Sequence, residues 1–465
     1  MSEEEIKNVW QNYFAQAPLS LRKTEETGTA VTAFNTNIDA VLKMSGKKLS
    51  ELIKKEKLSL AEIKDIKQTK LLKSQDVLKG VFKAFCGGIA EEWLSEEKTV
   101  YDWMKQNLGY DRLQMGGQGG IVANVLGILG VKKVIAHTNS LPLEQAQQFL
   151  KSDNIVSFDE KGQEKPAYKI NRTNDTPMIH WIVEFDKGDE VEIEGKKFVC
   201  PKSNRFIATY DPLNLHLAID ENFIKATTEN QVDYVILSGM HALTTNNDGV
   251  ALVEKVLPII NAWHQHGAII HLEIASTQDI TVRKAIIQKL ATNVDSIGIN
   301  ERELIDILEV IGENKLAELC AQDCHAENLF RALLRIKEIL KTPRIQLHFF
   351  GLYLTIQNKS FRVTAEQNRN GMILAATVAA GKAGTGNLNQ KENLLWALGQ
   401  NISDIGINEL ATISAIIEDK TLLTTGISQY AGFDIIAVPT ILIEKPLTLV
   451  GMGDTISSVS LIGAK

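Results

Sequence analysis

VDYVILSGMHALTTNNDGVALVEKVLPIINAWHQHGAIIHLEIA, residues 232–275, contains a strand, a helix and a second strand in that order. Its two ends are short β-rich runs, and residues 249–266 between them have the apolar spacing of a helix. Similar β-rich runs occur before and after this stretch, at residues 29–39, 131–139, 294–300 and 345–356. This alternation predicts an α/β fold with a mostly parallel sheet and helices on both of its faces.

Two stretches depart from that alternation. One is rich in Lys and Glu and helical in pattern, and the other alternates like an antiparallel meander with a turn at Lys187-Gly188. We find no internal repeat and no Pro/Gly/Ser linker, so we expect a smaller domain inserted into the larger one. The predicted large domain comprises residues 1–42, 113–165 and 209–465, and the predicted small domain residues 43–112 and 166–208.

The composition excludes several classes of partner. The chain has 465 residues, 44% hydrophobic content and a net charge of −7, without a Lys/Arg tract that would suit nucleic acid. Its apolar runs are broken well before the ~18 residues of a membrane span, and residues 1–10 lack the pattern of a signal peptide. We therefore expect a cytoplasmic protein with no membrane and no nucleic-acid partner.

Four cysteines in so long a chain do not form a disulfide framework. Cys86 and Cys200 are predicted to be buried thiols. Cys320 and Cys324 stand at i and i+4, with His325 adjacent, so a helix would bring both sulfurs to one face. A metal site is conceivable there, but no second ligand pair has zinc-site spacing, and structural thiols are the favoured interpretation.

The C-terminal stretch LVGMGDTISSVSLIGAK, residues 449–465, has the pattern of an anion site. Gly451, Met452 and Gly453 form a turn whose backbone N–H groups can approach an anion, and the helix that follows favours negative charge at its start. Asp454 would lie beside that anion, where a general base could accept a hydroxyl proton. The alternative is that Asp454 only caps the helix.

Two further segments fit a sugar site. In NTNID, Asn35, Asn37 and Asp39 occur at two-residue intervals at a strand end, so their side chains share one side and can bind the hydroxyls of a polyol. The loop MGGQGG, residues 115–120, precedes a predicted helix and lets backbone amides approach a ligand. Each segment taken singly could also be an ordinary turn or cap.

Two carboxylate motifs indicate a metal. HLE places His271 and Glu273 at one strand end, and NERE places Asn300 and Glu303 at the start of a helix. Magnesium commonly takes one or two carboxylates together with waters and phosphate oxygens, so a bridging magnesium is predicted. A strand-end turn and a capped helix are the alternatives for these two motifs.

Together, NTNID, MGGQGG, HLE, NERE and GMGD resemble, in their order, the ADP-dependent sugar kinases of archaea, the glucokinase and 6-phosphofructokinase group of the ribokinase superfamily. The resemblance spans nearly the whole chain. It implies a ribokinase-like αβα three-layer large domain, a smaller α/β lid domain, and transfer of the β-phosphoryl group of ADP to a sugar hydroxyl with release of AMP. The cofactor it implies is Mg²⁺.

The same resemblance implies roles for individual residues. The catalytic set is Asp454 as base with Gly451, Met452 and Gly453 as the anion hole. The metal set is Glu273, Glu303 and Asn300. The nucleotide set is Gly451, Gly453, Arg205, His348 and Val438. The sugar set is Asn35, Asn37, Asp39, Glu91, Gly116, Gly117, Gln118, Lys169 and Arg205.

The choice of sugar depends on the predicted lid. Glu91, in CGGIAEEW, is expected to accept a hydrogen bond from a glucose hydroxyl, as the resemblance to the glucokinases implies. The phosphate of fructose 6-phosphate needs cations, and Lys169, Arg172, Lys202 and Arg205 are candidates, unless they only form a solvated face. The acid together with the cations predicts use of both sugars, and Arg205 could instead contact the nucleotide.

Two rival functions stay open from the sequence. An ATP-dependent ribokinase-type kinase shares the Gly-x-Gly-Asp end but usually fits in a shorter chain. A non-catalytic sugar-nucleotide sensor on the same fold would not need a base and metal ligands together. The expected partners are small molecules, a sugar or sugar phosphate and ADP or AMP, with monomer and dimer both open.

Overall fold

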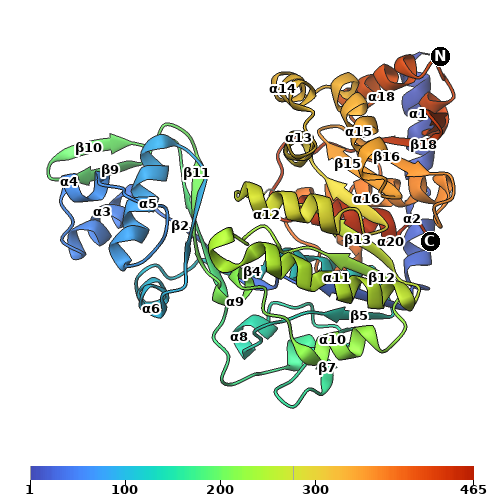
Figure 1. Cartoon of the computed structure of the whole chain (residues 1–465). Coiled ribbons are helices and arrows are strands. Elements are labelled where there is room, and N and C mark those ends of the chain that lie inside the picture. The colour runs from blue at the N-terminus through green and yellow to red at the C-terminus, as the bar shows by residue number, and fades with distance from the viewer. Residues whose placement is uncertain (1, 276) are drawn as a thin grey trace.

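The computed structural model describes residues 2–275 and 277–465, which form a large and a small α/β unit (Figure 1). An eleven-stranded sheet organises the large unit. Its inner strands are parallel and its outer strands antiparallel. In spatial order the strands are β17 (Ile427–Tyr430), β18 (Phe433–Pro439), β16 (Leu352–Asn358), β15 (Arg344–Phe349), β14 (Ser296–Ile299), β13 (Ile269–Glu273), β12 (Tyr234–Leu237), β1 (Thr29–Ala33), β5 (Lys133–Ala136), β6 (Ile155–Phe158) and β7 (Glu164–Pro166).

Helices cover both faces of this sheet, which explains why inner strands such as β12 and β14 are buried along their whole length. One face carries α2 (Ala17–Thr24), α7 (Gln118–Ile128), α16 (Ala365–Thr385) and α20 (Met452–Ile462). The other carries α10 (Glu221–Thr228), α11 (Gly249–Gln265), α13 (Glu301–Val310), α15 (Ala326–Leu340) and α18 (Asp404–Ile416). The remaining helices are α1 (Glu3–Phe14), α8 (Leu143–Ala146), η1 (Ala167–Lys169), α9 (Pro212–Leu215), η2 (Thr245–Asn247), α12 (Ile280–Ala285), η3 (Ile286–Leu290), α14 (Asn314–Gln322), α17 (Lys391–Leu394) and α19 (Leu422–Thr425).

The small unit is built on a five-stranded mixed sheet. In spatial order its strands are β3 (Glu91–Ser95), β11 (Asn204–Tyr210), β8 (Ile179–Phe185), β2 (Asn37–Lys43) and β4 (Arg112–Gly116). Alternate side chains of these strands pack against helices in a separate hydrophobic core. The helices and the added hairpin are α3 (Gly46–Lys55), α4 (Leu60–Lys64), α5 (Ser74–Gly87), α6 (Lys98–Asn107), β9 (Glu190–Ile193) and β10 (Lys196–Val199).

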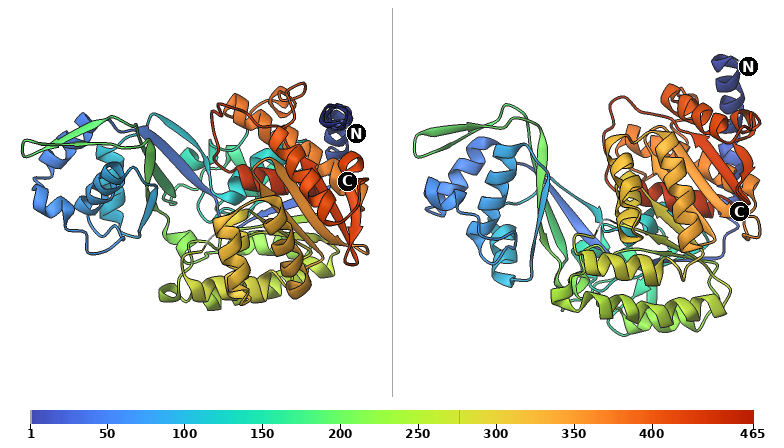
Figure 2. Two further views of the ribbon diagram at one scale, coloured as in Figure 1. Left: turned by 90° about the horizontal axis from the view of Figure 1, so that it is seen from above. Right: turned by 45° about the horizontal axis from the view of Figure 1, so that its top comes forward.

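The two units meet where the strands of the small sheet begin or end. Figure 2 shows the small unit standing apart from the large one, with those strands running between them. The small sheet includes the whole of β2, which begins at Asn37, and the whole of β4, which ends at Gly116. The predicted boundaries had assigned most residues of these two strands to the large domain. Conversely, β7 and η1 lie on the large unit because β7 pairs with β6 and Ala167 packs into the large core.

The α/β class and the mostly parallel sheet are as predicted from the alternation of strands and helices. In the described part of the chain, none of the helices combines the length and apolar character that crossing a membrane requires.

Candidate active site

A cavity of ≈ 290 Å³ lies between the open face of the small sheet and the large unit. The small sheet supplies side chains from β2, β3, β4, β8 and β11, and the large unit supplies the start of α7 and the segment before α20. The lining residues are Asn35, Asn37, Asp39, Val41, Glu92, Arg112, Gly117, Gln118, Ile121, His180, Ile182, Glu184, Arg205, Ile207, His241, Leu449, Val450, Gly451 and Asp454.

Strand register arranges the sheet side of this cavity in rows. Next to the large unit, a polar row runs through Gln114, Asp39, His180 and Thr209. The next row is apolar in the middle and charged at its ends, through Arg112, Val41, Ile182, Ile207 and Glu92. Beyond it, Arg205 stands opposite Glu184. A sugar ring has both hydroxyls and apolar C–H groups, and these rows offer complementary surfaces to both.

Asp39 and His180 carry the charge of the polar row. Burial raises the pKa of Asp39 to about 6, although His180, Asn37 and Gln114 act in the opposite direction. Burial alone would lower the pKa of His180, but the hydrogen bond from its Nε2 to Asp211 Oδ2 at 3.1 Å and the charges of Asp211, Glu92 and Asp39 raise it to about 9. The row therefore holds a cationic imidazole beside a carboxyl group that can exchange a proton near neutral pH.

A side-chain network fixes the edge of the cavity. Asn214 Nδ2 donates to Asn35 Oδ1 at 2.7 Å and to Asp211 Oδ2 at 2.6 Å. Asn139 Nδ2 donates in turn to Asn214 Oδ1 at 2.5 Å. Asn35 and His180 are thus connected through Asp211 and Asn214, which lie where β11 leads into α9. The network holds the polar row in register with the large unit.

The glycine loop before α7 closes against this row. Gly117 has φ +72°, and a Cβ there would lie 2.6 Å from Asn37 Oδ1, so a side chain is excluded for both reasons. Asn37 Nδ2 donates to Asp39 Oδ1 at 3.1 Å, while its own Oδ1 is buried without a partner among the described residues. A buried amide oxygen that lacks a donor fits a ligand hydroxyl.

The start of α20 has the backbone geometry that the predicted anion cradle requires. Gly451 precedes the helix with φ +60°, and in the part of the chain that the structure describes no acceptor takes the N–H groups of residues 451–454. The first four N–H groups of a helix have no intrahelical partner, and the helix dipole adds positive potential there. This turn can therefore hold an anionic group at the wall of the cavity.

Asp454 lies in the first turn of α20 and lines the cavity. Gln118 fixes it, because Gln118 Nε2 donates to Asp454 Oδ1 at 2.9 Å while Gln118 Oε1 accepts from the N–H of Gly239 at 3.1 Å. Burial and the nearby Glu273 raise the pKa of Asp454 to about 6, against the effect of Gln118, Lys382 and His241. A carboxylate with this pKa at the wall of a cavity can act as a general base near neutral pH.

The predicted metal residues lie behind the turn. Glu273 and Glu303 are buried, and the pKa of each is raised by burial first, with the charge of Glu273 next in the case of Glu303. Asn300 caps α13, because its side chain accepts from the N–H of Glu303 at 3.0 Å and Glu303 Oε2 accepts from the N–H of Asn300 at 2.9 Å. Among the described residues, three or more His, Cys, Asp or Glu side chains are nowhere grouped as a protein-only metal site.

Comparisons with known proteins identify the family. A model for the ADP-specific phosphofructokinase/glucokinase conserved region matches residues 29–463. The chain belongs to this family. An ADP-dependent glucose/glucosamine kinase of Pyrococcus furiosus is 32% identical over 464 residues, with 98% of each chain covered.

Solved structures of the family share the fold. A solved structure of the last common ancestor of ADP-dependent phosphofructokinases from Methanosarcinales is 27% identical, with a TM-score of 0.86 over 100% of this chain and 99% of that one. An ADP-dependent kinase in complex with fructose-6-phosphate and ADPbetaS is 26% identical, with a TM-score of 0.80 over 98% and 97%. The predicted resemblance to the ADP-dependent sugar kinases and the predicted ribokinase-like fold are confirmed.

The choice of Glu91 as the acid facing the sugar needs correction. Glu91 lies on the core side of β3, where it forms an ion pair with Lys83 and accepts from Trp93 Nε1 at 2.9 Å. Its neighbour Glu92 points to the opposite face, lines the cavity and accepts from Thr209 Oγ1 at 2.6 Å. Side chains alternate along a strand, so the buried Trp93 already indicates which of the two glutamates faces inward.

The four predicted cations do not lie together in the structure. Arg205 lines the cavity. Lys169 lies on the large unit and pairs with Asp153 at 2.9 Å, while the guanidinium of Arg172 is buried against Phe158, Thr138 and Asp220. Lys202 is exposed beside Gly88, outside the cavity. Three of the four predicted cations therefore lie away from the sugar cavity in this structure.

The remaining predictions concern nucleotide residues and cysteines. A Cβ on Gly453 would lie 2.9 Å from His348 Nε2, so His348 borders the turn, whereas the side chain of Val438 is buried within β18.

Cys324 Sγ donates to the carbonyl of Cys320 at 2.9 Å and Cys320 is buried, which fits the structural interpretation. Cys200 is buried and Cys86 is half-buried.

Several residues that line the cavity or lie near Asp454 were not predicted. Glu92, His180 and Arg112 occupy alternate positions on their strands opposite buried aromatic and aliphatic residues, so period-two counting could have found them. His241 and Lys382 lie on a loop and on a helix far from any motif. Only the folded chain brings them to Asp454.

Proposed function

We propose that this protein transfers the β-phosphoryl group of ADP to a hexose hydroxyl and releases AMP. The observation that supports this most is the position of Asp454, between a sugar-sized cavity with a polar row and a glycine turn whose N–H groups have no acceptor among the described residues. A carboxylate base with a cavity for the hydroxyl on one side and an anion hole on the other suits transfer of a phosphoryl group to that hydroxyl.

In the proposed reaction the hexose lies against the polar row of the small sheet. Asp39, Asn37 and Glu92 accept hydrogen bonds from its hydroxyls and the cationic His180 donates one. Asp454 accepts the proton of the attacking hydroxyl, and the N–H groups at the start of α20 bind the transferred group. Closure of the small unit over the cavity excludes water that would otherwise hydrolyse ADP.

Magnesium is proposed to bind beside Glu273 and Glu303. Two buried carboxylates whose pKa values are raised, next to Asp454, form an acidic cluster that a divalent cation would relieve. When bound, the ion neutralises charge on the phosphate oxygens. Asn300 supports this pair through the backbone of α13, since its side chain is used in the cap.

Use of both glucose and fructose 6-phosphate is proposed from the opposite charges in the cavity. Glu92 suits a neutral hydroxyl, while Arg112 and Arg205 suit a phosphate. Arg205 lies in the outer row and could also reach the nucleotide. We further propose that the enzyme works in the cytoplasm, since all four of its cysteines are free thiols.

A coupled assay with purified protein and Mg²⁺ tests the proposal. ADP and ATP are crossed with glucose and fructose 6-phosphate, and AMP and phosphorylated sugar are both measured. AMP and sugar phosphate in equal amounts from ADP with either sugar are expected. Turnover with ATP alone would contradict the donor, and binding without turnover for every pair would contradict the activity.

A further inference from the structure

Lys382 lies behind the glycine turn, near the end of α16, and no sequence motif includes it. Helix α16 packs along α20, so the lysine reaches the first turn of α20. Lys382 Nζ donates to the carbonyl of Gly451 at 3.1 Å and to Thr455 Oγ1 at 3.1 Å.

The carbonyl of Gly451 is held by three donors. Besides Lys382 Nζ, it accepts from the backbone N–H of Thr455 at 3.2 Å and from Thr455 Oγ1 at 2.7 Å. An ordinary carbonyl at this helix position would accept only the N–H four residues on. Lys382 and Thr455 thus add a charged and a hydroxyl donor to one backbone oxygen.

The position of the Gly451 carbonyl oxygen also determines the position of the hydrogen-bond donor on the opposite side of the same peptide. The carbonyl of Gly451 and the N–H of Met452 belong to one planar trans peptide, so they point in opposite directions. The N–H of Met452 is one of the groups at the start of α20 for which the described residues supply no acceptor. A cation on the carbonyl also polarises the peptide and strengthens its N–H as a donor.

We propose that Lys382 is a positioning residue for phosphoryl transfer, which holds the Gly451–Met452 peptide so that its N–H faces the transferred group. This inference rests on the proposed function. Because Lys382 acts through the backbone and lies behind the turn, it affects the transition state more than the binding of sugar.

The charge of Lys382 fits this role. Burial lowers its pKa to about 8, although Asp454 and Asp39, the carboxylates that face it, act in the opposite direction. The ammonium is therefore charged below pH 8 and loses its proton as the pH rises through that value. The alkaline side of the activity profile is expected to report this loss.

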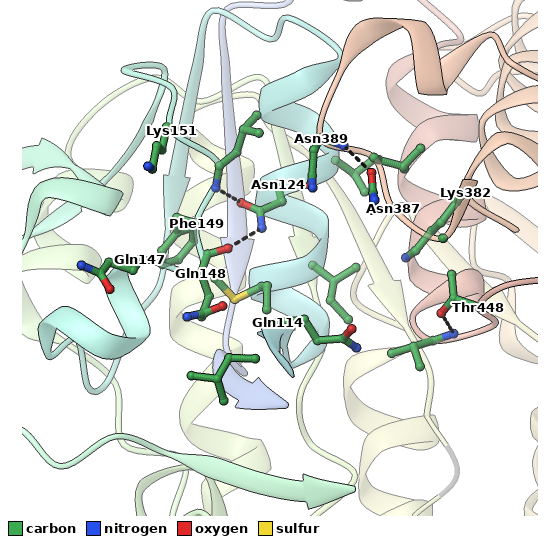
Figure 3. A pocket seen from close by; sticks show the side chains of 18 residues that line it. Gln114, Asn124, Gln147, Gln148, Phe149, Lys151, Lys382, Asn387, Asn389 and Thr448 are labelled. Carbon is green, nitrogen blue, oxygen red and sulfur yellow. Dashed lines mark hydrogen bonds between the residues drawn. The ribbon is translucent and has the colours of Figure 1, made fainter. Parts of the chain in front are cut away.

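A second lysine provides a matched control. Lys382 borders a second cavity, of ≈ 570 Å³, and Lys151 lines its opposite wall (Figure 3). Gln147 and Gln148 lie on the wall with Lys151, and Thr448 lies beside Lys382. Lys151 has no hydrogen bond to the turn among the described residues, so its loss changes the same cavity without touching Gly451.

The experiment compares Lys382→Met, Lys382→Arg and Lys151→Met with the wild type. We expect Lys382→Met to lower kcat about 10–100-fold, with KM for the sugar and Kd for ADP changed less than about threefold. Its activity should no longer fall above pH 8. Lys382→Arg should recover part of kcat and shift the alkaline fall upward, and Lys151→Met should match the wild type.

Other outcomes would overturn the inference. A wild-type kcat in Lys382→Met, or an unchanged alkaline fall, would show that the lysine does not position the turn. If Lys382→Met fails to fold, Thr455→Val removes the hydroxyl donor from the same carbonyl and should lower kcat in the same selective way; equal losses in kcat and Kd would contradict the role. A wild type that forms no AMP would count against the proposed function instead.

Discussion

Asp454 lies between groups that change its pKa in opposite directions. Burial and Glu273 raise it, while Gln118, Lys382 and His241 lower it, and the result is about 6. A base must be deprotonated to accept a proton yet basic enough to attract one, so a value just below neutral suits catalysis at neutral pH. The hydrogen bond from Gln118 also fixes the direction in which the carboxylate points.

Replacing Asp454 with Asn should remove the base and keep the shape. We expect kcat to fall about 10²–10⁴-fold while ADP still binds, because the N–H groups of the turn remain. In the wild type the deprotonated form is the active one, so kcat should fall as the pH decreases through about 6. Steady-state kinetics from pH 5 to 8 and calorimetry with ADP test both points. Near-wild-type turnover in Asp454→Asn would contradict the assignment.

Glu303 offers a separate test of the metal. Glu303→Gln keeps the cap of α13, since Gln serves as well as Glu at that position, but removes the negative charge. We expect the Mg²⁺ concentration for half-maximal activity to rise about tenfold or more. The folded state raises the pKa of Glu303, so its charge costs stability above the ordinary pKa of a Glu, and the variant without Mg²⁺ should unfold at a higher temperature at pH 8. An unchanged Mg²⁺ requirement would remove Glu303 from the metal site.

At the scale of the element, strand alternation decides which side chains meet the sugar. On β3 the pair Glu91-Glu92 presents one carboxylate to each face, and Trp93 anchors the core face. The same alternation on β8 places His180, Ile182 and Glu184 on the cavity side and Trp181 and Val183 in the core. A one-residue error in register therefore moves a prediction to the opposite face.

The two glutamates provide a paired test. Glu92→Ala should raise KM for glucose about tenfold or more, because a charged acceptor for a sugar hydroxyl is lost from the cavity. Glu91→Ala should leave KM for both sugars near the wild type, and its main effect should be on thermal stability through the contacts with Lys83 and Trp93. Fructose 6-phosphate should be affected less than glucose by Glu92→Ala. Equal effects of both variants on glucose would refute the assignment by alternation.

The sequence predicts the site residues best where they lie within one short motif. Gly451, Asp454, Asn37, Asp39 and Gln118 all line one cavity, as their motifs indicate. Residues that reach the site through contacts between distant segments cannot be predicted from a motif. Lys169 and Arg172 follow a meander pattern, but pairing of β7 with β6 carries them to the large unit. His241 and Lys382 reach Asp454 only through the packing of distant elements.

At the scale of the whole molecule, the cavity belongs to neither unit alone. Its polar row comes from the small sheet, while Asp454 and the turn come from the large unit. Three of the covalent connections between the units pass through short segments at Asn35, Gly117 and Asp211, and each of these takes part in the site. A further connection, residues 170–178, leads from η1 on the large unit to β8 in the small sheet. A rotation at these segments would bring the rows of the small sheet closer to the turn.

Closure of the small unit should therefore require one ligand at the small sheet and one at the turn of the large unit. We expect the radius of gyration from small-angle X-ray scattering to decrease when Mg²⁺, ADP and sugar are present together, and to change less with ADP or sugar alone. The Asp454→Asn variant is suited to this measurement because it should bind both ligands without consuming them. Asp211→Ala provides a comparison, since it removes the hydrogen bonds of His180 and Asn214 at one connecting segment and should shift the open–closed balance. An identical radius of gyration with and without the full set of ligands would mean that the two units hold a fixed arrangement, and the exclusion of water from ADP would then have to come from the cavity walls already in place.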